Sequence, residues 1–126
     1  MKGKRGYGES GEEYALTLLK NNGYQIIQRN FRSKIGEIDI IALQSGNLVF
    51  IEVKTRWSAK FGKPEEAVTP RKLKTIYKVG EYFMKIQSLK IQSMKTGNDL
   101  PKRAGVEVVA IDMQKGEPIN SRLIQA

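Results

Sequence analysis

The sequence predicts an α/β fold in which helices flank a mixed central β-sheet. Two stretches carry apolar residues three and four positions apart, as amphipathic helices do, one from about Glu9 to Asn22 and one from Thr69 onward. Three runs rich in Ile and Val lie between these helices, and a fourth follows the second helix. This order fits helices and strands layered around a mixed sheet. The chain, residues 1–126, has the length of a single domain.

Each predicted helix has recognisable end signals. Asn22-Gly23 follows the apolar stripe of the first helix as a C-terminal cap. Thr69 and Pro70 suit the N-cap and the first helical position of the second helix, which we expect to reach at least Met84. The segment Lys85–Lys95 either extends this helix or forms a short helix of its own.

Turn and loop signals separate the predicted strands. The turn Gln44–Asn47 joins the second and third strands as a hairpin. A strand that follows the second helix would enter the sheet by a right-handed crossover. The strands are expected at Tyr24–Phe31, Gly36–Ile41, Leu48–Arg56 and Val106–Met113, with an edge strand at Ile119–Ile124.

The hairpin carries acids near its open end. With the turn at Ser45-Gly46, Asp39 lies opposite Glu52, and alternation puts both on one face while Ile38 points to the other. Carboxylates opposite one another repel. Either a bound cation such as magnesium or a raised carboxylate pKa is therefore expected to compensate. The alternative is a solvated sheet face on which charges happen to meet.

The composition excludes several classes of site. The chain has no His and no Cys, which excludes Ser-His-Asp triads, His-ligated zinc, disulfides and thiolate metal sites. Any catalysis must therefore use carboxylates, lysine and metal. No apolar run has the length of a membrane span, and the basic N-terminus lacks the apolar stretch of a signal peptide. We expect a cytoplasmic protein with no membrane partner.

The excess positive charge is concentrated in one segment. The chain has 22 Lys and Arg against 13 Asp and Glu, a formal net charge of +9. The segment Lys54–Arg103 holds 13 basic residues and four acids, which accounts for the whole surplus. Nucleic acid is the expected partner, because neutralising phosphates drives non-specific binding. Alternatively, these lysines are simply the solvated face of a helix.

Glu12 lies on the apolar side of the first helix. It precedes Ala15 and Leu16 by three and four residues, whereas Glu13 points outward. Glu12 is either a first-turn residue favoured by the helix dipole or a third carboxylate directed at the hairpin acids.

Four motifs follow one another along the chain. They are Gly11-Glu12-x-x-Ala15, Gly36-Glu37-Ile38-Asp39, Phe50-Ile51-Glu52-Val53-Lys54-Thr55-Arg56 and Phe61-Gly62-x-Pro64-x-x-Ala67-Val68. Their order and spacing are similar to the YraN-like family of small bacterial proteins, which resembles the PD-(D/E)XK nuclease superfamily and, within it, archaeal Holliday-junction resolvases. The resemblance covers nearly the whole chain and implies a restriction-endonuclease-like core of order αβββαβ.

The resemblance also implies roles for individual residues. Asp39 and Glu52 are the expected ligands of magnesium or manganese, with the Val53 carbonyl as a further ligand. Lys54 is the expected catalytic lysine, and Glu12 the auxiliary acid. These roles imply a metal-dependent nuclease that hydrolyses phosphodiester bonds in DNA, including branched or recombination intermediates. The alternative is a non-catalytic nucleic-acid-binding protein that keeps the nuclease fold.

Two further acids, Glu107 and Glu37, are not among the expected catalytic or metal-binding residues. The family has Asp at the start of the last core strand, where this chain has Glu107, so the role of Glu107 stays open. Glu37 is expected to pair with Lys54 across the strands as a structural contact.

Basic residues near the hairpin and along the second helix are the expected nucleic-acid contacts. A junction resolvase needs two active sites and hence a homodimer, although the sequence shows no dimer seam. The expected contacts are Arg56, Lys60, Lys63, Arg71, Lys72 and Lys74.

Overall fold

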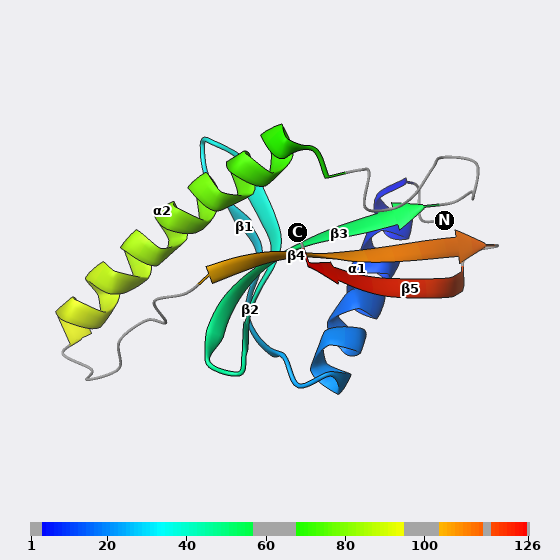
Figure 1. The fold of residues 1–126 in the computed structure, drawn as a ribbon, viewed down its shortest axis with the longest axis horizontal. Helices are drawn as coiled ribbons and strands as arrows, with labels where there is room; N and C mark the ends of the chain where they lie inside the picture. Colours follow the sequence, from blue (N-terminus) through cyan, green and yellow to red (C-terminus); the bar gives the residue numbers. More distant parts are fainter. Residues whose placement is uncertain (1–3, 57–67, 95–103, 115–116, 126) are drawn as a thin grey trace.

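The computed structural model describes residues 4–56, 68–94, 104–114 and 117–125 as two helices and a five-stranded mixed sheet. The strands lie in chain order across the sheet; β3 and β4 are parallel, and the other neighbouring pairs are antiparallel. The helices lie on opposite faces of the sheet (Figure 1), so the predicted α/β class is confirmed. The elements are α1 (Lys4–Asn21), β1 (Gln25–Arg32), β2 (Glu37–Gln44), β3 (Asn47–Arg56), α2 (Pro70–Met94), β4 (Ala104–Gln114) and β5 (Glu117–Gln125).

The helix ends follow their sequence signals. Thr69 caps α2, since its Oγ1 accepts the Lys72 backbone N–H at 3.1 Å. Gly23 ends α1 with a φ of 85°, and the Tyr24 N–H bonds back to the Leu19 carbonyl, as in a Schellman motif. One boundary differs from expectation, since α1 begins at Lys4 rather than near Glu9. The end of α2, which the sequence left open beyond Met84, lies at Met94. The segment after Met84 therefore extends the helix.

The β2–β3 hairpin has the predicted register only near its turn. Ser45 and Gly46 have φ values of 50° and 79°, as a two-residue turn with two left-handed positions requires. Ile41 pairs with Phe50 as expected. The ladder ends one pair further on, at Ile40 and Ile51, and β2 continues along β1 alone.

This divergence corrects two expectations about the hairpin. Asp39 and Glu52 lie beyond the last β2–β3 pair, so they are not ladder partners. Glu37 does not pair with Lys54 across the strands; its Oε2 lies 3.1 Å from Nε of Arg32, its neighbour on β1. Both pairings required the ladder to continue past Ile40.

The core has two halves, one on each face of the sheet. Under α1, the apolar residues of the helix pack on Ile40, Val49 and Ile51. Under α2, Ile76 and Phe83 pack on Ile41, Leu48 and Phe50, and Gly80 allows the helix to approach Phe50 closely. Contrary to expectation, Ile38 belongs to the α2 half together with Ile41. The alternation of side chains along β2 is therefore broken around Asp39, where β2 separates from β3.

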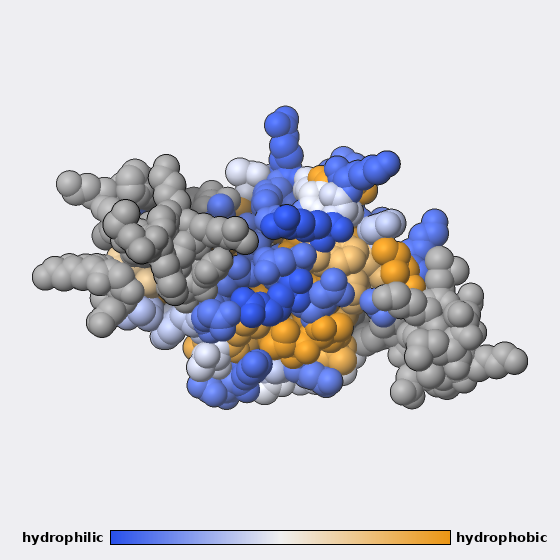
Figure 2. Space-filling model, turned by 180° about the vertical axis from the view of Figure 1, so that it is seen from behind, coloured by the Kyte–Doolittle hydropathy of each residue, from blue (hydrophilic) through white to orange (hydrophobic). Residues whose placement is uncertain are grey.

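One helix on each face leaves some apolar surface uncovered. Figure 2, seen from behind, shows hydrophilic residues across the middle of the surface with hydrophobic residues exposed beside them. Ile27 on β1 and Leu123 on β5, the two edge strands, are each 40% exposed. Neither described helix has the length and hydropathy needed to cross a membrane.

Candidate functional site

The candidate site lies where β2 and β3 separate. The Val53 N–H faces the opening, and Oδ2 of Asp39 accepts its hydrogen bond at 2.8 Å. The Asp39 side chain thus does what a backbone carbonyl does elsewhere in the ladder, and it spares the strand an unpaired donor. This bond holds one Asp39 oxygen against β3, immediately beside Glu52.

Glu52 is the most buried acid of the site. It is 7% exposed and extends towards α2, where Nζ of Lys72 lies 3.7 Å from its Oε1. Burial raises the pKa of Glu52 to about 7, and the negative charge of Asp39 acts in the same direction, while Lys72 and Lys54 oppose it. Glu52 is therefore a buried carboxylate whose charge needs nearby cations.

Asp39 shares this environment. Burial raises its pKa, the Val53 N–H and the two lysines lower it, and the charge of Glu37 raises it. Lys54 is half-buried, and its charge acts on both carboxylates. The structure thus brings Asp39, Glu52 and Lys54 together although no ladder pair joins them.

Glu12 on α1 lies near Asp39. Burial raises its pKa and the charge of Asp39 adds to this, while Arg29 opposes both effects. The Oε1 atom of Glu12 is buried and has no hydrogen-bond partner among the residues that the structure describes. The bond that Arg29 makes, at 2.8 Å, goes to Glu13 instead. A buried oxygen near the charge of Asp39 can accept a hydrogen bond from a bound water or coordinate a cation.

Gly11 explains how α1 comes so close to β3. A Cβ atom at Gly11 would collide with Oγ1 of Thr55, a short side chain that cannot swing far away. Glycine at this position therefore lets the first helix lie against β3, next to Glu12. The adjacent Gly and Glu of the first motif have separate roles, one in packing and one in the site.

The oxygen atoms at the site suit a hard cation. Asp39 and Glu52 supply carboxylates and the Val53 carbonyl is a further oxygen, which is the donor type that magnesium prefers. In the part of the chain that is described, no three acidic side chains converge closely enough to hold an ion among themselves. Magnesium commonly keeps several waters and uses only one or two carboxylates, so two acids are compatible with its chemistry.

The expected nucleic-acid contacts fall into three groups. Arg71 and Lys74 are exposed on the first turns of α2. Lys72 points into the site, and Arg56 lies at the end of β3 with its Nε 4.0 Å from Oδ1 of Asp112. Two further expected contacts, Lys60 and Lys63, lie outside the described residues.

Sequence reasoning treated Lys72 only as a surface charge. Its spacing does carry a signal, since it precedes the buried Ile76 by four residues and therefore lies at the edge of the apolar stripe. The position of Glu52, however, depends on how the crossover places α2 over β3. Only the folded structure reveals the ion pair.

Glu107 does not join the acids of the candidate site. It lies on β4 beside Ile51 and is 7% exposed, and it accepts a hydrogen bond from the Tyr24 hydroxyl at 2.6 Å. Tyr24 follows the C-terminal end of α1, whereas Glu12 lies in its N-terminal half. The open role of Glu107 therefore has to be sought at the opposite end of α1.

Comparison with known proteins identifies relatives that all belong to one family. Residues 11–111 match the uncharacterised protein family UPF0102. A UPF0102 protein of Caldicellulosiruptor saccharolyticus is 53% identical over 87 residues, which cover 69% of this chain and 74% of that protein. Similar proteins of Syntrophomonas wolfei and Persephonella marina are 47% and 41% identical over 81 and 83 residues, covering 64% and 66% of this chain and 70% and 72% of theirs.

The matched region begins at Gly11, beside Glu12, and ends at Ile111 in β4. It therefore contains the residues of the candidate site, which are Glu12, Asp39, Glu52, Lys54 and Lys72. With this coverage and these identities, the chain belongs to the uncharacterised protein family UPF0102.

Proposed function

We propose that this protein is a metal-dependent nuclease of the PD-(D/E)XK type that hydrolyses phosphodiester bonds in DNA, including branched intermediates of recombination or repair. The main support is the group formed by Asp39, Glu52 and Lys54 at the opened end of the hairpin, with Glu12 beside it. Buried carboxylates of raised pKa are an unfavourable arrangement that functional sites often contain.

The chain's own residues have distinct roles in this proposal. Asp39, Glu52 and the Val53 carbonyl would hold magnesium or manganese, which, when bound, stabilises negative charge on the phosphoryl and leaving oxygens. Lys54 orients the attacking water and stabilises charge in the transition state. The unpaired oxygen of Glu12 accepts a hydrogen bond from a water in the site.

The basic surface supports the choice of a polyanionic substrate. Arg71 and Lys74 are exposed on the same turns of α2 from which Lys72 enters the site. A phosphate backbone bound along these residues would pass the carboxylates. Such contacts fix position without reading sequence, which suits an enzyme that recognises DNA shape.

The proposal is tested by one cleavage panel. Linear, flap, single-stranded and four-way-junction DNA, with an RNA duplex for comparison, are incubated with magnesium, manganese or EDTA. We expect metal-dependent cleavage that Asp39→Asn, Glu52→Gln and Lys54→Ala each abolish while DNA binding is retained. Glu81→Gln is the matched control, because it removes the same charge from an exposed position on α2. Full activity of Lys54→Ala would exclude this mechanism.

Metal binding has a readout that does not depend on cleavage. Magnesium should raise the melting temperature of the wild-type protein, since a ligand that binds only the folded state stabilises it. Asp39→Asn and Glu52→Gln should lose this shift and Glu81→Gln should keep it. Sedimentation with and without a four-way junction tests for the homodimer that paired cleavage requires.

A second candidate function is non-catalytic binding of nucleic acid. The observation that favours it is the Lys72–Glu52 contact, which supplies a cation to the site from the protein itself. This alternative expects salt-sensitive binding, no cleavage of any substrate in the panel, and acid-site variants that change stability alone.

A further inference from the structure

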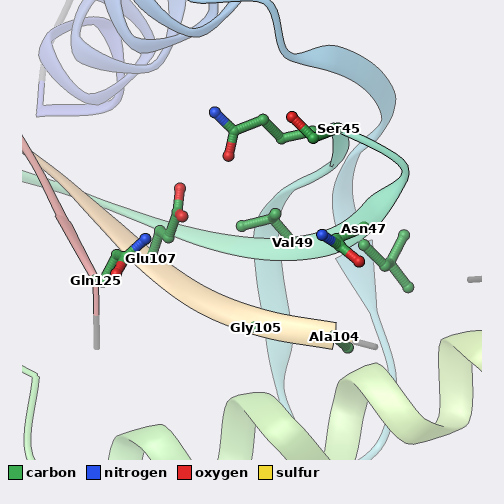
Figure 3. A pocket seen from close by; sticks show the side chains of 9 residues that line it. Ser45, Asn47, Val49, Ala104, Gly105, Glu107 and Gln125 are labelled. Atoms are coloured by element: carbon green, nitrogen blue, oxygen red, sulfur yellow. The ribbon is translucent and has the colours of Figure 1, made fainter. Parts of the chain in front are cut away.

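A second polar site lies at the other end of β3, away from Lys54. It is a pocket of about 450 Å³ on the α1 side of the sheet, next to the β2–β3 turn. Figure 3 shows it from close by, with Glu107 and Gln125 at one end and Asn47 and Ala104 at the other. From Val49 to Lys54 the strand advances roughly 17 Å, so this pocket is separate from the candidate active site.

The pocket lies over Gly105, a position of β4 that has no side chain. Gly105 shares the face of β4 that carries Glu107 and Val109, and a Cβ placed on it would meet no atom within 4 Å. The helix α1 ends at Asn21 and turns back into β1. Val49 and the bare backbone of Gly105 thus lie among the residues that line the pocket.

The wall of the pocket is polar and carries one charge. Glu107 is 7% exposed, and the Tyr24 hydroxyl holds its Oε1 at 2.6 Å, while its Oε2 has no hydrogen bond among the described residues. Burial and this hydrogen bond raise the pKa of Tyr24, so the hydroxyl keeps its proton and remains the donor. Glu107 is accordingly fixed in place with acceptor capacity to spare. The carboxamides of Gln44, Asn47 and Gln125 complete the wall.

We propose that this pocket binds an unpaired guanine base, with Glu107 accepting hydrogen bonds from its N1–H and N2–H₂ groups. Guanine alone among the common bases has two adjacent donors on its Watson–Crick edge. Adenine and cytosine place a ring nitrogen acceptor beside their amino group, which would face the carboxylate lone pairs unfavourably. The open space over Gly105 leaves room for a planar ring, and the carboxamides can donate to O6.

A planar cation such as an arginine side chain has the same pair of donors, but the charges favour the base. The protein has a net charge of +9, and among the described residues that line the pocket only Glu107 is charged. A cationic ligand would approach against the overall field, whereas a nucleotide would be attracted by it. The Watson–Crick edge is free only in single-stranded, flipped or terminal guanines. The pocket would therefore bind a base outside a duplex, whether or not the Asp39 site cleaves.

The test uses nuclear magnetic resonance of ¹⁵N-labelled protein titrated with 5′-GMP, 5′-AMP, 5′-CMP and agmatine. The nucleotides share a phosphate, so contacts with the basic surface are equal among them. We expect GMP to shift the amide signals of Gly105, Glu107 and Gln125 and to bind at least tenfold more tightly than AMP or CMP. Equal shifts with GMP and AMP, shifts with agmatine alone, or no shifts at these residues would overturn the proposal.

Three variants give the test a structural control. Gly105→Leu adds a side chain to the pocket at a position where a Cβ would meet no atom within 4 Å, and it should abolish the GMP shifts. Glu107→Gln should weaken GMP binding at least tenfold by replacing an acceptor with a donor. Thr17→Leu, which adds similar bulk on the exposed side of α1, should leave binding unchanged. If Gly105→Leu disturbs the spectrum, Gln125→Leu near the end of the edge strand serves in its place. Wild-type affinity in both pocket variants would also overturn the proposal.

Discussion

Oδ2 of Asp39 and the backbone nitrogen of Val53 lie 2.8 Å apart, beyond the last ladder pair of the β2–β3 hairpin. One hydrogen bond therefore both limits how far the strands separate and places a carboxylate beside Glu52. Structure and charge at the site are coupled through this contact, and substitutions can distinguish the two.

Replacing Asp39 by Ala or by Asn separates the hydrogen bond from the charge. Both changes remove the negative charge, but Asn keeps an oxygen that can accept the Val53 N–H. A buried donor left unpaired costs about 1–3 kcal/mol. We expect Asp39→Ala to have a free energy of unfolding lower than that of Asp39→Asn by about this amount in urea denaturation. Equal values would mean that the bond contributes nothing to stability.

The pKa of Glu52 makes stability depend on pH. Its value is raised from 4.5 to about 7, so between these values the folded protein binds a proton that the unfolded chain has released. Stability should therefore fall as pH rises through this window, by about 3 kcal/mol from this residue. Burial of Asp39 and Glu12, whose pKa values are also raised, acts in the same direction.

Glu52→Gln should remove its share of this pH dependence. The free energy of unfolding, measured in EDTA, is expected to differ less between pH 5 and pH 8 for Glu52→Gln than for wild type. The variant should be more stable than wild type at pH 8. Glu81→Gln, at an exposed position, should behave as wild type does. An unchanged pH dependence in Glu52→Gln would contradict the raised pKa.

Lys72 and Lys74 offer a matched pair of charges on one helix. The Nζ atom of Lys72 lies 3.7 Å from Oε1 of Glu52, and its side chain is 41% exposed, whereas Lys74 is an exposed residue. Lys72→Gln should lower the stability at pH 8 by about 1 kcal/mol, an amount kept small by solvent screening, and Lys74→Gln should not. Each variant should reduce the salt dependence of DNA binding by about one phosphate contact. The same stability loss in both variants would argue against a specific role for Lys72.

Gly11→Ala tests how α1 is seated on β3. Alanine should favour the helix by about 0.5–1 kcal/mol, but its Cβ would collide with Oγ1 of Thr55, and overpacking costs about 1–3 kcal/mol. We expect a net loss of stability. In a Thr55→Ala background the collision disappears, so Gly11→Ala should become neutral or stabilising. A double-mutant cycle with a coupling below about 0.5 kcal/mol would refute the close contact.

Local chemistry accounts for what the sequence predicts correctly. Ser45-Gly46 allows one short turn type, Thr69-Pro70 starts a helix, and Gly23 ends one, so the elements and their order follow from neighbouring residues. The end of the β2–β3 ladder at Ile40 does not follow from neighbouring residues. Beyond that point β2 pairs with β1 and not with β3. The ion pair of Lys72 and the hydrogen bond of Glu107 also join residues distant in sequence. Their partners depend on packing that periodicity does not encode.

The chain order of the sheet has a consequence for how the site forms. Glu12, Asp39, Glu52 and Lys54 all lie in α1 and the meander β1–β2–β3, whose neighbours in space are neighbours in sequence. Lys72 arrives only with the crossover helix that precedes β4. Since contacts between nearby segments form faster than distant ones, we expect the acids to assemble first. The negative charges of these acids then repel one another until α2 docks and brings Lys72. Docking of this helix should therefore be the step of folding that is most sensitive to pH.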